Sequence, residues 1–212
     1  MMTDIMTPRR AEAPATGQRG PADHERRQQI INAADEHFRH YGYGKTTVAD
    51  LARAIGLSSA YIYKFFESKQ AIGQAVCQQI LTDMVESVQR IADERTSTSD
   101  RLRRIFQTLA RRGLEMFFNQ RKMHDIAVTA CMEHWPAIEE YKERLGRILA
   151  QVIGEGRDNG DFEKKTPLDE TVHAIMHAMV AFLHPMLLEE CLDEAEGQAL
   201  AIANLVLRSL VP

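Results

Sequence analysis

The stretch TTVADLARAIGLSSAYIYKFFESKQAI, residues 46–72, decides the fold of this chain. It contains two short apolar periodicities joined by a tight turn at Gly56-Leu57-Ser58, where glycine favours a helix end and serine favours the cap of a new helix. Thr47 and Asp50 have the spacing of a capping box that opens the first of these helices. The pattern predicts a helix-turn-helix, in which the second helix lies in the major groove of DNA.

Two such short helices need support, because helices of about eight residues are unstable alone in water. The flanking sequence supplies it on both sides. Apolar residues recurring every three or four positions predict one helix over 24–41, ended by Gly42 and Gly44. A longer helix is predicted over 68–92, with Ser68 as its cap.

Three linked elements of this region form a recognisable set: the pair Thr46-Thr47, an Ala-x-x-x-Gly-Leu-Ser turn from Ala52 to Ser58, and Tyr-x-Phe-Phe-x-Ser-Lys at 63–69. Together they resemble the DNA-binding domain of TetR-family repressors, over roughly residues 23–83. Ala60 stands where that family often has glycine, and Tyr61 where it often has a small residue. Both lie on the recognition helix, so no operator sequence is carried over from a relative.

The resemblance implies DNA contacts by nine residues: Thr46, Thr47, Ser58, Ser59, Ala60, Tyr61, Tyr63, Lys64 and Lys69. The threonines lie at a helix N-terminus, which suits a phosphate, although they can also act as plain caps. The residues at 58–61 are expected at base edges and the groove. For the Tyr63 hydroxyl we favour a phosphate over packing, and the two lysines are expected to contact phosphates, Lys69 the more strongly.

Further amphipathic stretches follow, and no period-two alternation long enough for a strand is found, so the chain is predicted to be all-α. These helices are predicted near 100–118, 121–133, 136–157, 167–190 and 194–210, with a loop at 156–162. The predicted organisation is a disordered arm at 1–22, in which Arg9, Arg10 and Arg19 fall, a three-helix DNA-binding domain at 23–83, and a helical ligand-binding and dimerisation domain at 84–212.

Charge and composition agree with this division. The formal net charge of −4 divides into +2 for residues 1–70 and −6 for residues 71–212, as expected for a DNA-facing module on an acidic body. No stretch predicts a signal peptide or membrane span, so we expect a cytoplasmic protein. Cys77, Cys131 and Cys191 are widely spaced, which disfavours a disulfide scaffold or zinc knuckle and favours buried apolar roles over redox sensing.

Histidines gather on the helix predicted over 167–190. His173 and His177 have the i, i+4 spacing that can bind one metal, and His184 falls on the same predicted face. We favour instead a pocket for an apolar or amphipathic small molecule, with no metal and no cofactor, because Met and aromatic walls suit such a ligand. Its predicted lining is Met116, Phe117, Met132, Trp135, His173, Met176, His177 and Met179.

The resemblance also implies a homodimer held by the last two helices, 167–190 and 194–210, both apolar around much of their circumference. A twofold dimer would bind a pseudo-palindromic operator. The sequence therefore predicts a DNA-binding transcriptional regulator, a repressor released by a small-molecule effector, and not an enzyme. The alternative is a metal-responsive regulator or an enzyme that uses the C-terminal histidines.

Overall fold

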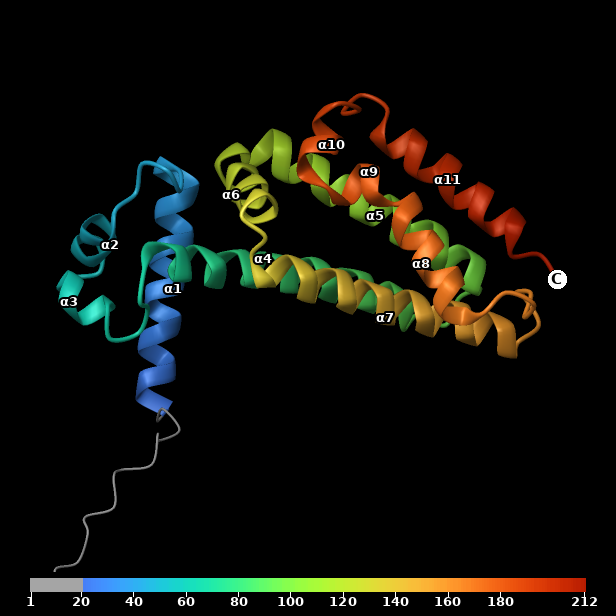
Figure 1. Cartoon of the computed structure of the whole chain (residues 1–212), viewed down its shortest axis with the longest axis horizontal. Coiled ribbons are helices and arrows are strands. Elements are labelled where there is room, and N and C mark those ends of the chain that lie inside the picture. Colours follow the sequence, from blue (N-terminus) through green and yellow to red (C-terminus); the bar gives the residue numbers. More distant parts are fainter. Residues whose placement is uncertain (1–20) are drawn as a thin grey trace, which may run out of the picture.

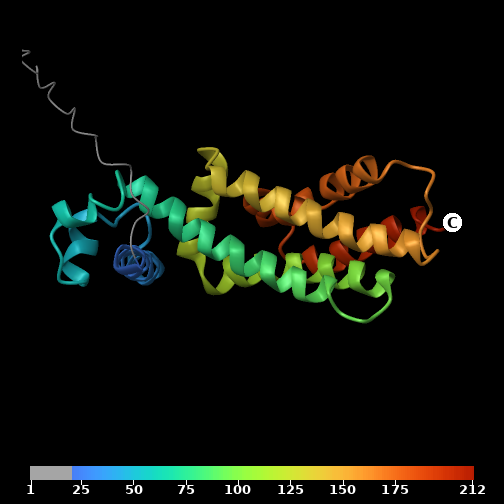
Figure 2. The same cartoon turned by 90° about the horizontal axis from the view of Figure 1, so that it is seen from below.

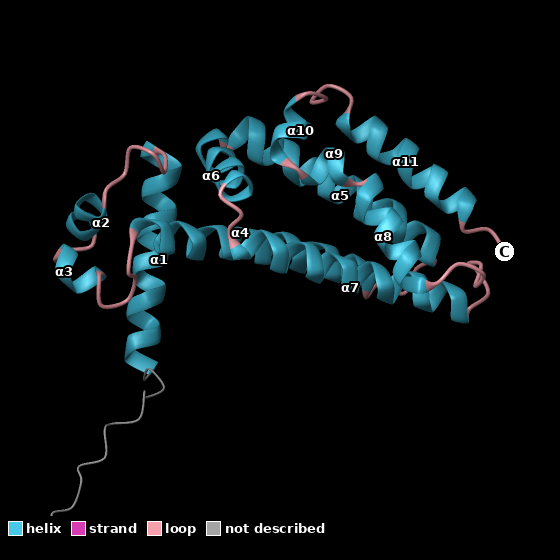
Figure 3. Ribbon diagram, in the orientation of Figure 1, coloured by secondary structure: helices cyan, strands magenta, loops and turns pink. Residues whose placement is uncertain are grey.

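The computed structural model describes residues 21–212; residues 1–20, and with them the arginines of the predicted arm, lie outside the described residues. In the described part the chain forms eleven helices and no strand, which confirms the all-α prediction (Figure 3). The helices are α1 (Pro21–Tyr41), α2 (Val48–Ala54), α3 (Ser59–Ile62), α4 (Lys69–Ala92), α5 (Thr98–Asn119), α6 (Arg121–Met132), α7 (Pro136–Asp158), α8 (Leu168–Ala178), α9 (Val180–Leu183), α10 (Pro185–Glu189) and α11 (Ala195–Ser209).

The first three helices and the start of α4 form a small unit at one end of the molecule (Figure 1). The predicted capping box is confirmed: the Thr47 hydroxyl accepts from the Asp50 N–H, and the Asp50 carboxylate accepts from the Thr47 N–H. Ser58 and Ser68 cap α3 and α4 with their hydroxyls, which accept from the N–H groups of Tyr61 and Ala71. Gly56 has a φ of 66°, the left-handed conformation that lets the chain turn from α2 to α3. The shared core includes Ile30, Phe38, Leu51, Ile62, Phe66 and Ile72.

In the rest of the chain, α5, α6 and α7 pack against α4. In Figures 1 and 2, α4 and α7 run side by side along the long axis of the molecule. α11 packs on α5, and α8 lies against α7. Because α4 starts inside the small N-terminal unit and ends beside α5 and α7, it is one rigid element shared by both halves of the chain.

The prediction of a single helix over 167–190 is wrong, because the chain forms three shorter helices there, α8 to α10. Pro185 lacks an N–H and disfavours helical angles in the residue before it, and His184 is accordingly extended at φ −91° and ψ 117°. The predicted single histidine face is therefore lost at His184. A smaller difference concerns α5, which begins at Thr98 with Ser97 as its cap, two residues before the start predicted at 100.

Candidate DNA-binding surface and ligand cavity

The exposed face of the helix-turn-helix is formed by α3 and the turn after it. Ser58, Ala60, Tyr63 and Lys64 are exposed, and Tyr63 keeps 52% of its surface free. Ser59 and Tyr61 are half-buried, with the Tyr61 ring centre 5.4 Å from that of Phe65. Thr47, at the start of α2, is also exposed. The structure thus brings seven of the nine predicted DNA contacts to the surface around α2 and α3, with Ile62 holding α3 in the core.

The other two predicted contacts, Thr46 and Lys69, are occupied within the protein. Thr46 is 1% exposed, and its hydroxyl donates to the Gly42 carbonyl at 2.8 Å. The Lys69 ammonium donates to the carbonyls of Tyr43 (2.9 Å) and Thr46 (3.0 Å) and lies 4.4 Å from the centre of the Tyr43 ring. These two side chains therefore fasten the loop between α1 and α2 to the start of α4.

The two halves of the chain meet at a junction where the aromatic rings of Tyr43 and Trp135 pack over Gly73. Trp135, predicted to line the ligand pocket, is instead 1% exposed and lies at this junction, with its ring centre 5.8 Å from that of Tyr43. Both rings close over Gly73 of α4, where an added Cβ would lie 2.7 Å from Tyr43 and 2.9 Å from Trp135. Burial, and secondly the charge of Glu133, raise the pKa of the Tyr43 hydroxyl.

Polar contacts continue this junction. The Trp135 indole N–H donates to Glu133 at 2.8 Å, and the Gln70 amide donates to the same carboxylate oxygen at 3.2 Å. At the other end of α6, Arg39 of α1 donates to the side chain of Gln120, and Lys122 donates to the carbonyl of His40. Both ends of α6 are thus linked to the N-terminal unit.

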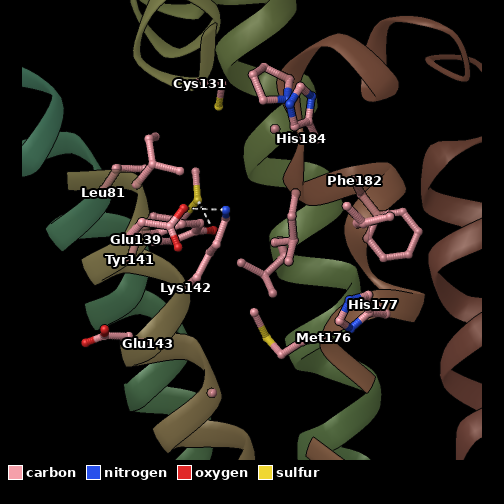
Figure 4. A pocket seen from close by; sticks show the side chains of 18 of the residues that line it. Leu81, Cys131, Glu139, Tyr141, Lys142, Glu143, Met176, His177, Phe182 and His184 are labelled. Atoms are coloured by element: carbon pink, nitrogen blue, oxygen red, sulfur yellow. Dashed lines mark hydrogen bonds and ion pairs between the residues drawn. The ribbon is translucent and has the colours of Figure 1, made fainter. Parts of the chain in front are cut away.

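A cavity of about 1440 Å³ lies among helices α4 to α10 (Figure 4). Most of its wall is apolar; this part includes Leu81, Met84, Leu109, Met116, Ala127, Ile138, Ala150, Val172, Met176, Phe182, Leu183 and Leu188. Glu139 and Lys142 of α7 form an ion pair of 2.7 Å at one side, and His177 lies on the opposite wall in α8. Such a mostly apolar wall with a few polar groups is typical of a small-molecule site.

Of three buried polar groups at the cavity, Tyr141 and His124 have partners among the described residues and His184 Nδ1 has none there. The Tyr141 hydroxyl donates to the sulfur of Met84 at 3.0 Å, and burial raises its pKa well above the ordinary value. His124 is 1% exposed, and its Nε2 lies 2.7 Å from Glu189. His184 Nδ1 is buried without a hydrogen-bond partner among residues 21–212, although it lines the cavity (Figure 4).

Four of the eight predicted ligand residues line this cavity: Met116, His173, Met176 and His177. The rings of the two histidines are 4.7 Å apart, and both side chains are exposed. The other four lie elsewhere: Trp135 at the junction, Met179 fully buried in the core, Phe117 against His124 and Arg121, and Met132 exposed over 63% of its surface. Met179 is the C-cap residue of α8 and packs into the core, whereas its neighbours Met176 and Val180 line the cavity.

The cavity wall contributed by α7 was missed. Glu139, Lys142, Glu143 and Arg147 lie along it, and in the sequence they look like the ordinary solvent face of an amphipathic helix. No sequence signal separates such charges from those that border a cavity, because the difference depends on α8 packing opposite them. Within residues 21–212, no group of three or more His, Cys, Asp or Glu side chains is arranged to hold a metal ion.

Several apolar side chains remain exposed on the last helices. Leu205 of α11 is 60% exposed, and Val180, Met186 and Leu187 are each at least 40% exposed. α11 covers α5 with its other face, through Ala199, Ala203 and Leu207. None of the helices in the described part is both long and apolar enough to cross a membrane.

The comparisons with known proteins agree with this geometry. The family model described as bacterial regulatory proteins, TetR family, matches residues 30–76, and one described as tetracyclin repressor-like, C-terminal domain, matches residues 98–202. The nucleoid occlusion factor SlmA of Vibrio cholerae is 26% identical over 70% of this chain and 76% of its own length. The regulator BetI of Stenotrophomonas maltophilia is 29% identical over 58% of this chain, and the match spans less than two thirds of BetI, 59%.

Solved structures show the same fold. A TetR-family transcriptional regulator from Pectobacterium atrosepticum superposes with a TM-score of 0.75 at 21% identity, covering 91% of this chain and 98% of that one. FadR of Thermus thermophilus, a TetR-family repressor solved with lauroyl-CoA, gives a TM-score of 0.65 at 19% identity over 88% and 95% of the two chains. With both halves matched by family models and the helix-turn-helix in place, this chain belongs to the TetR family of DNA-binding transcriptional regulators.

Proposed function

We propose that this regulator is a homodimeric repressor that binds a pseudo-palindromic operator and releases it when an apolar or amphipathic small molecule occupies the large cavity. The observation that carries this proposal is the cavity itself, about 1440 Å³ of mostly apolar space inside a domain joined to the DNA-binding unit. Burial of apolar ligand surface there would supply the binding free energy.

The DNA-binding part of the proposal uses the surface around α3. Ser58, Ser59, Ala60 and Tyr61 would face base edges, and the exposed Thr47, Tyr63 and Lys64 would contact phosphates. Thr46 and Lys69 would support this surface rather than contact DNA, because their polar atoms are already bonded to the protein.

Ligand identity is supported by the cavity walls and by relatives. Among proteins of this fold, Thermus thermophilus FadR was solved with lauroyl-CoA, Bacillus subtilis FadR with stearoyl-CoA and RolR with resorcinol. Those ligands belong to those proteins, which are 16–19% identical to this one. In this chain, the volume of the cavity and its Met and Leu side chains suit an extended apolar group. Lys142 on one wall and His177 on the opposite wall could hold a polar group of the ligand.

Two elements would carry the signal to the DNA. Helix α6 lines the cavity with His124, Ala127 and Cys131 and is linked at both ends to the N-terminal unit. Helix α4 lines it with Leu81 and Met84 and begins directly after the helix-turn-helix. A ligand that moves either helix would change the separation of the two recognition helices, which must be about 34 Å for adjacent half-sites. The exposed apolar side chains of α9 to α11 support a dimer interface there.

The proposal is tested by filling the cavity. Gly146 lines it, and an added Cβ would meet only Val172, at 3.9 Å, so Gly146→Leu places a side chain in free space. Gly154, also in α7, does not line the cavity and has nothing within 4 Å of an added Cβ, which makes Gly154→Leu the matched control.

Operator DNA is first selected from genomic fragments by the purified protein. A chain-length series of fatty acids and acyl-CoAs, with resorcinol beside them, is then titrated against protein with and without that DNA. We expect one class to weaken operator binding, reciprocally with DNA weakening the ligand. Gly146→Leu should reduce the affinity of that class by about tenfold or more, or ~1.4 kcal/mol, and Gly154→Leu should not. Ligand binding that is equal with and without DNA would reject the proposed release mechanism.

A further inference from the structure

A second cleft lies between α4 and α5, and it shares no residue with the large cavity. Its volume is about 590 Å³. Nine residues line it, of which only Ile91 is a large apolar one: Ser87, Arg90, Ile91, Arg104, Gln107, Thr108, Arg111, Arg112 and Glu115. Four arginines thus face one cleft that contains a single carboxylate.

The positive charge of this cleft is only partly balanced by the protein. Arg104 is paired with Glu94, at 2.8 Å between Nη2 and Oε1, and its Nη1 lies 3.7 Å from Asp100. Arg112 approaches Glu115 only to 3.7 Å, beyond hydrogen-bond distance. Arg90 and Arg111 are exposed and have no ion pair within residues 21–212. The cleft therefore keeps a net positive charge, although residues 71–212 together carry −6.

We propose that this cleft binds a small molecule with two or more phosphate groups, separately from the effector in the large cavity. Guanidinium groups bind phosphate oxygens bidentately, and converging arginines suit an anion of several charges better than a single carboxylate. Thr108 and Gln107 add hydrogen-bonding side chains to the wall. With so little apolar wall, the cleft does not fit an acyl chain or an apolar peptide anchor.

The position of the cleft separates its ligand from operator DNA. α4 runs away from the helix-turn-helix (Figure 1), and Arg90 lies near its far end. At 1.5 Å per residue, Arg90 is roughly 30 Å along the helix from Lys69. The phosphates of an operator held on α3 would therefore not fill this cleft. A bound anion would instead bridge α4 and α5 and offset the repulsion between their arginines.

The experiment compares the full-length wild-type protein with the double variant Arg90→Gln, Arg111→Gln. The matched control is Arg95→Gln, because Arg95 is exposed in the α4–α5 loop and does not line the cleft. Inorganic phosphate, pyrophosphate and ATP are titrated by calorimetry at 0.15 M salt, with a poly-glutamate peptide and non-operator duplex DNA as competing classes of polyanion. Thermal unfolding is recorded with and without each probe.

We expect saturable binding of pyrophosphate or ATP to the wild type and to Arg95→Gln, weaker binding of phosphate, and at least a tenfold loss in the double variant. The ligand should raise the Tm only where the two arginines are present. Without ligand, the Tm of the double variant should be no lower than that of the wild type, because the substitutions remove repulsion between the arginines of the cleft. A lower Tm of the unliganded double variant, no saturable phosphate binding, or binding of the peptide or DNA alone would each overturn the proposal.

Discussion

The N-terminal unit of this regulator and its larger C-terminal body, from Leu81 onward, differ in how completely their interiors are filled. α1 to α3 with the start of α4 form a small unit with Ile30, Phe38, Leu51 and Ile62 all 0% exposed. The larger body is hollow, since both clefts described above are lined entirely by residues from Leu81 onward. A short three-helix unit has little surface to bury and must fill its core, whereas the larger body can leave space that a ligand later fills.

The largest expected effect is a direct test of this difference. Leu51→Ala in the filled core should cost about 2–5 kcal/mol of unfolding free energy. Leu81 lies in the cavity wall (Figure 4), so one side of it faces space and has fewer contacts to lose. The loss of unfolding free energy in Leu81→Ala should therefore be smaller than that in Leu51→Ala by roughly 1 kcal/mol or more. Urea unfolding of the wild type and of each variant measures the two losses of unfolding free energy. Equal losses would show that the wall is packed as tightly as the core.

The junction between the halves gives the next effect. Gly73→Ala introduces a Cβ within 3.0 Å of Tyr43 and Trp135, so the rings must shift, at a cost of about 1–3 kcal/mol. Gly154→Ala, in open space on α7, should instead stabilise the protein by about 0.5–1 kcal/mol. Thermal unfolding and operator affinity are measured for both. Because the junction links α6 to the DNA-binding unit, Gly73→Ala should also change the release of DNA by ligand; unchanged release would place the coupling elsewhere.

A smaller effect is expected at the cap of α2. Thr47→Ala removes the capping hydroxyl, which should cost about 1 kcal/mol. Hydrogen bonds from Thr47 lower the pKa of Asp50 below its ordinary value. The carboxylate therefore adds stability above its unfolded pKa, near 4, and loses it as the pH falls through its lower folded pKa. Unfolding curves between pH 2 and 6 should show a weaker pH dependence for Thr47→Ala; an identical dependence would contradict the role of the capping box.

The structure of the N-terminal unit could be predicted from the sequence more completely than that of the larger body. The caps at Thr47, Ser58 and Ser68 depend on residues three positions away, so they could be located from the sequence. The cavity depends on helices far apart in the chain, and half of its predicted lining was misplaced. Trp135 has the apolar character of a pocket residue, but its partner Tyr43 is 92 positions away. The break at His184 did have a local signal, Pro185, which the apolar pattern around it concealed.

The smallest expected effect distinguishes Lys64 from Lys69, both of which the sequence predicted to contact phosphates. Lys64 is exposed with its ammonium 5.3 Å from the Tyr61 ring centre, whereas Lys69 donates to two backbone carbonyls. Lys64→Ala should therefore weaken operator binding severalfold and lower the slope of log affinity against log salt by about 1, with unfolding unchanged.

Lys69→Ala should show the opposite behaviour. It should lower the Tm, because the carbonyls of Tyr43 and Thr46 lose their donor, while the salt slope of operator binding stays that of the wild type. The two variants are compared by anisotropy between 0.05 and 0.3 M salt, at a temperature where both remain folded. If Lys69→Ala lowers the slope and Lys64→Ala does not, then DNA lies against the start of α4 rather than against the exposed face of α3, and the placement of the recognition helix must be revised.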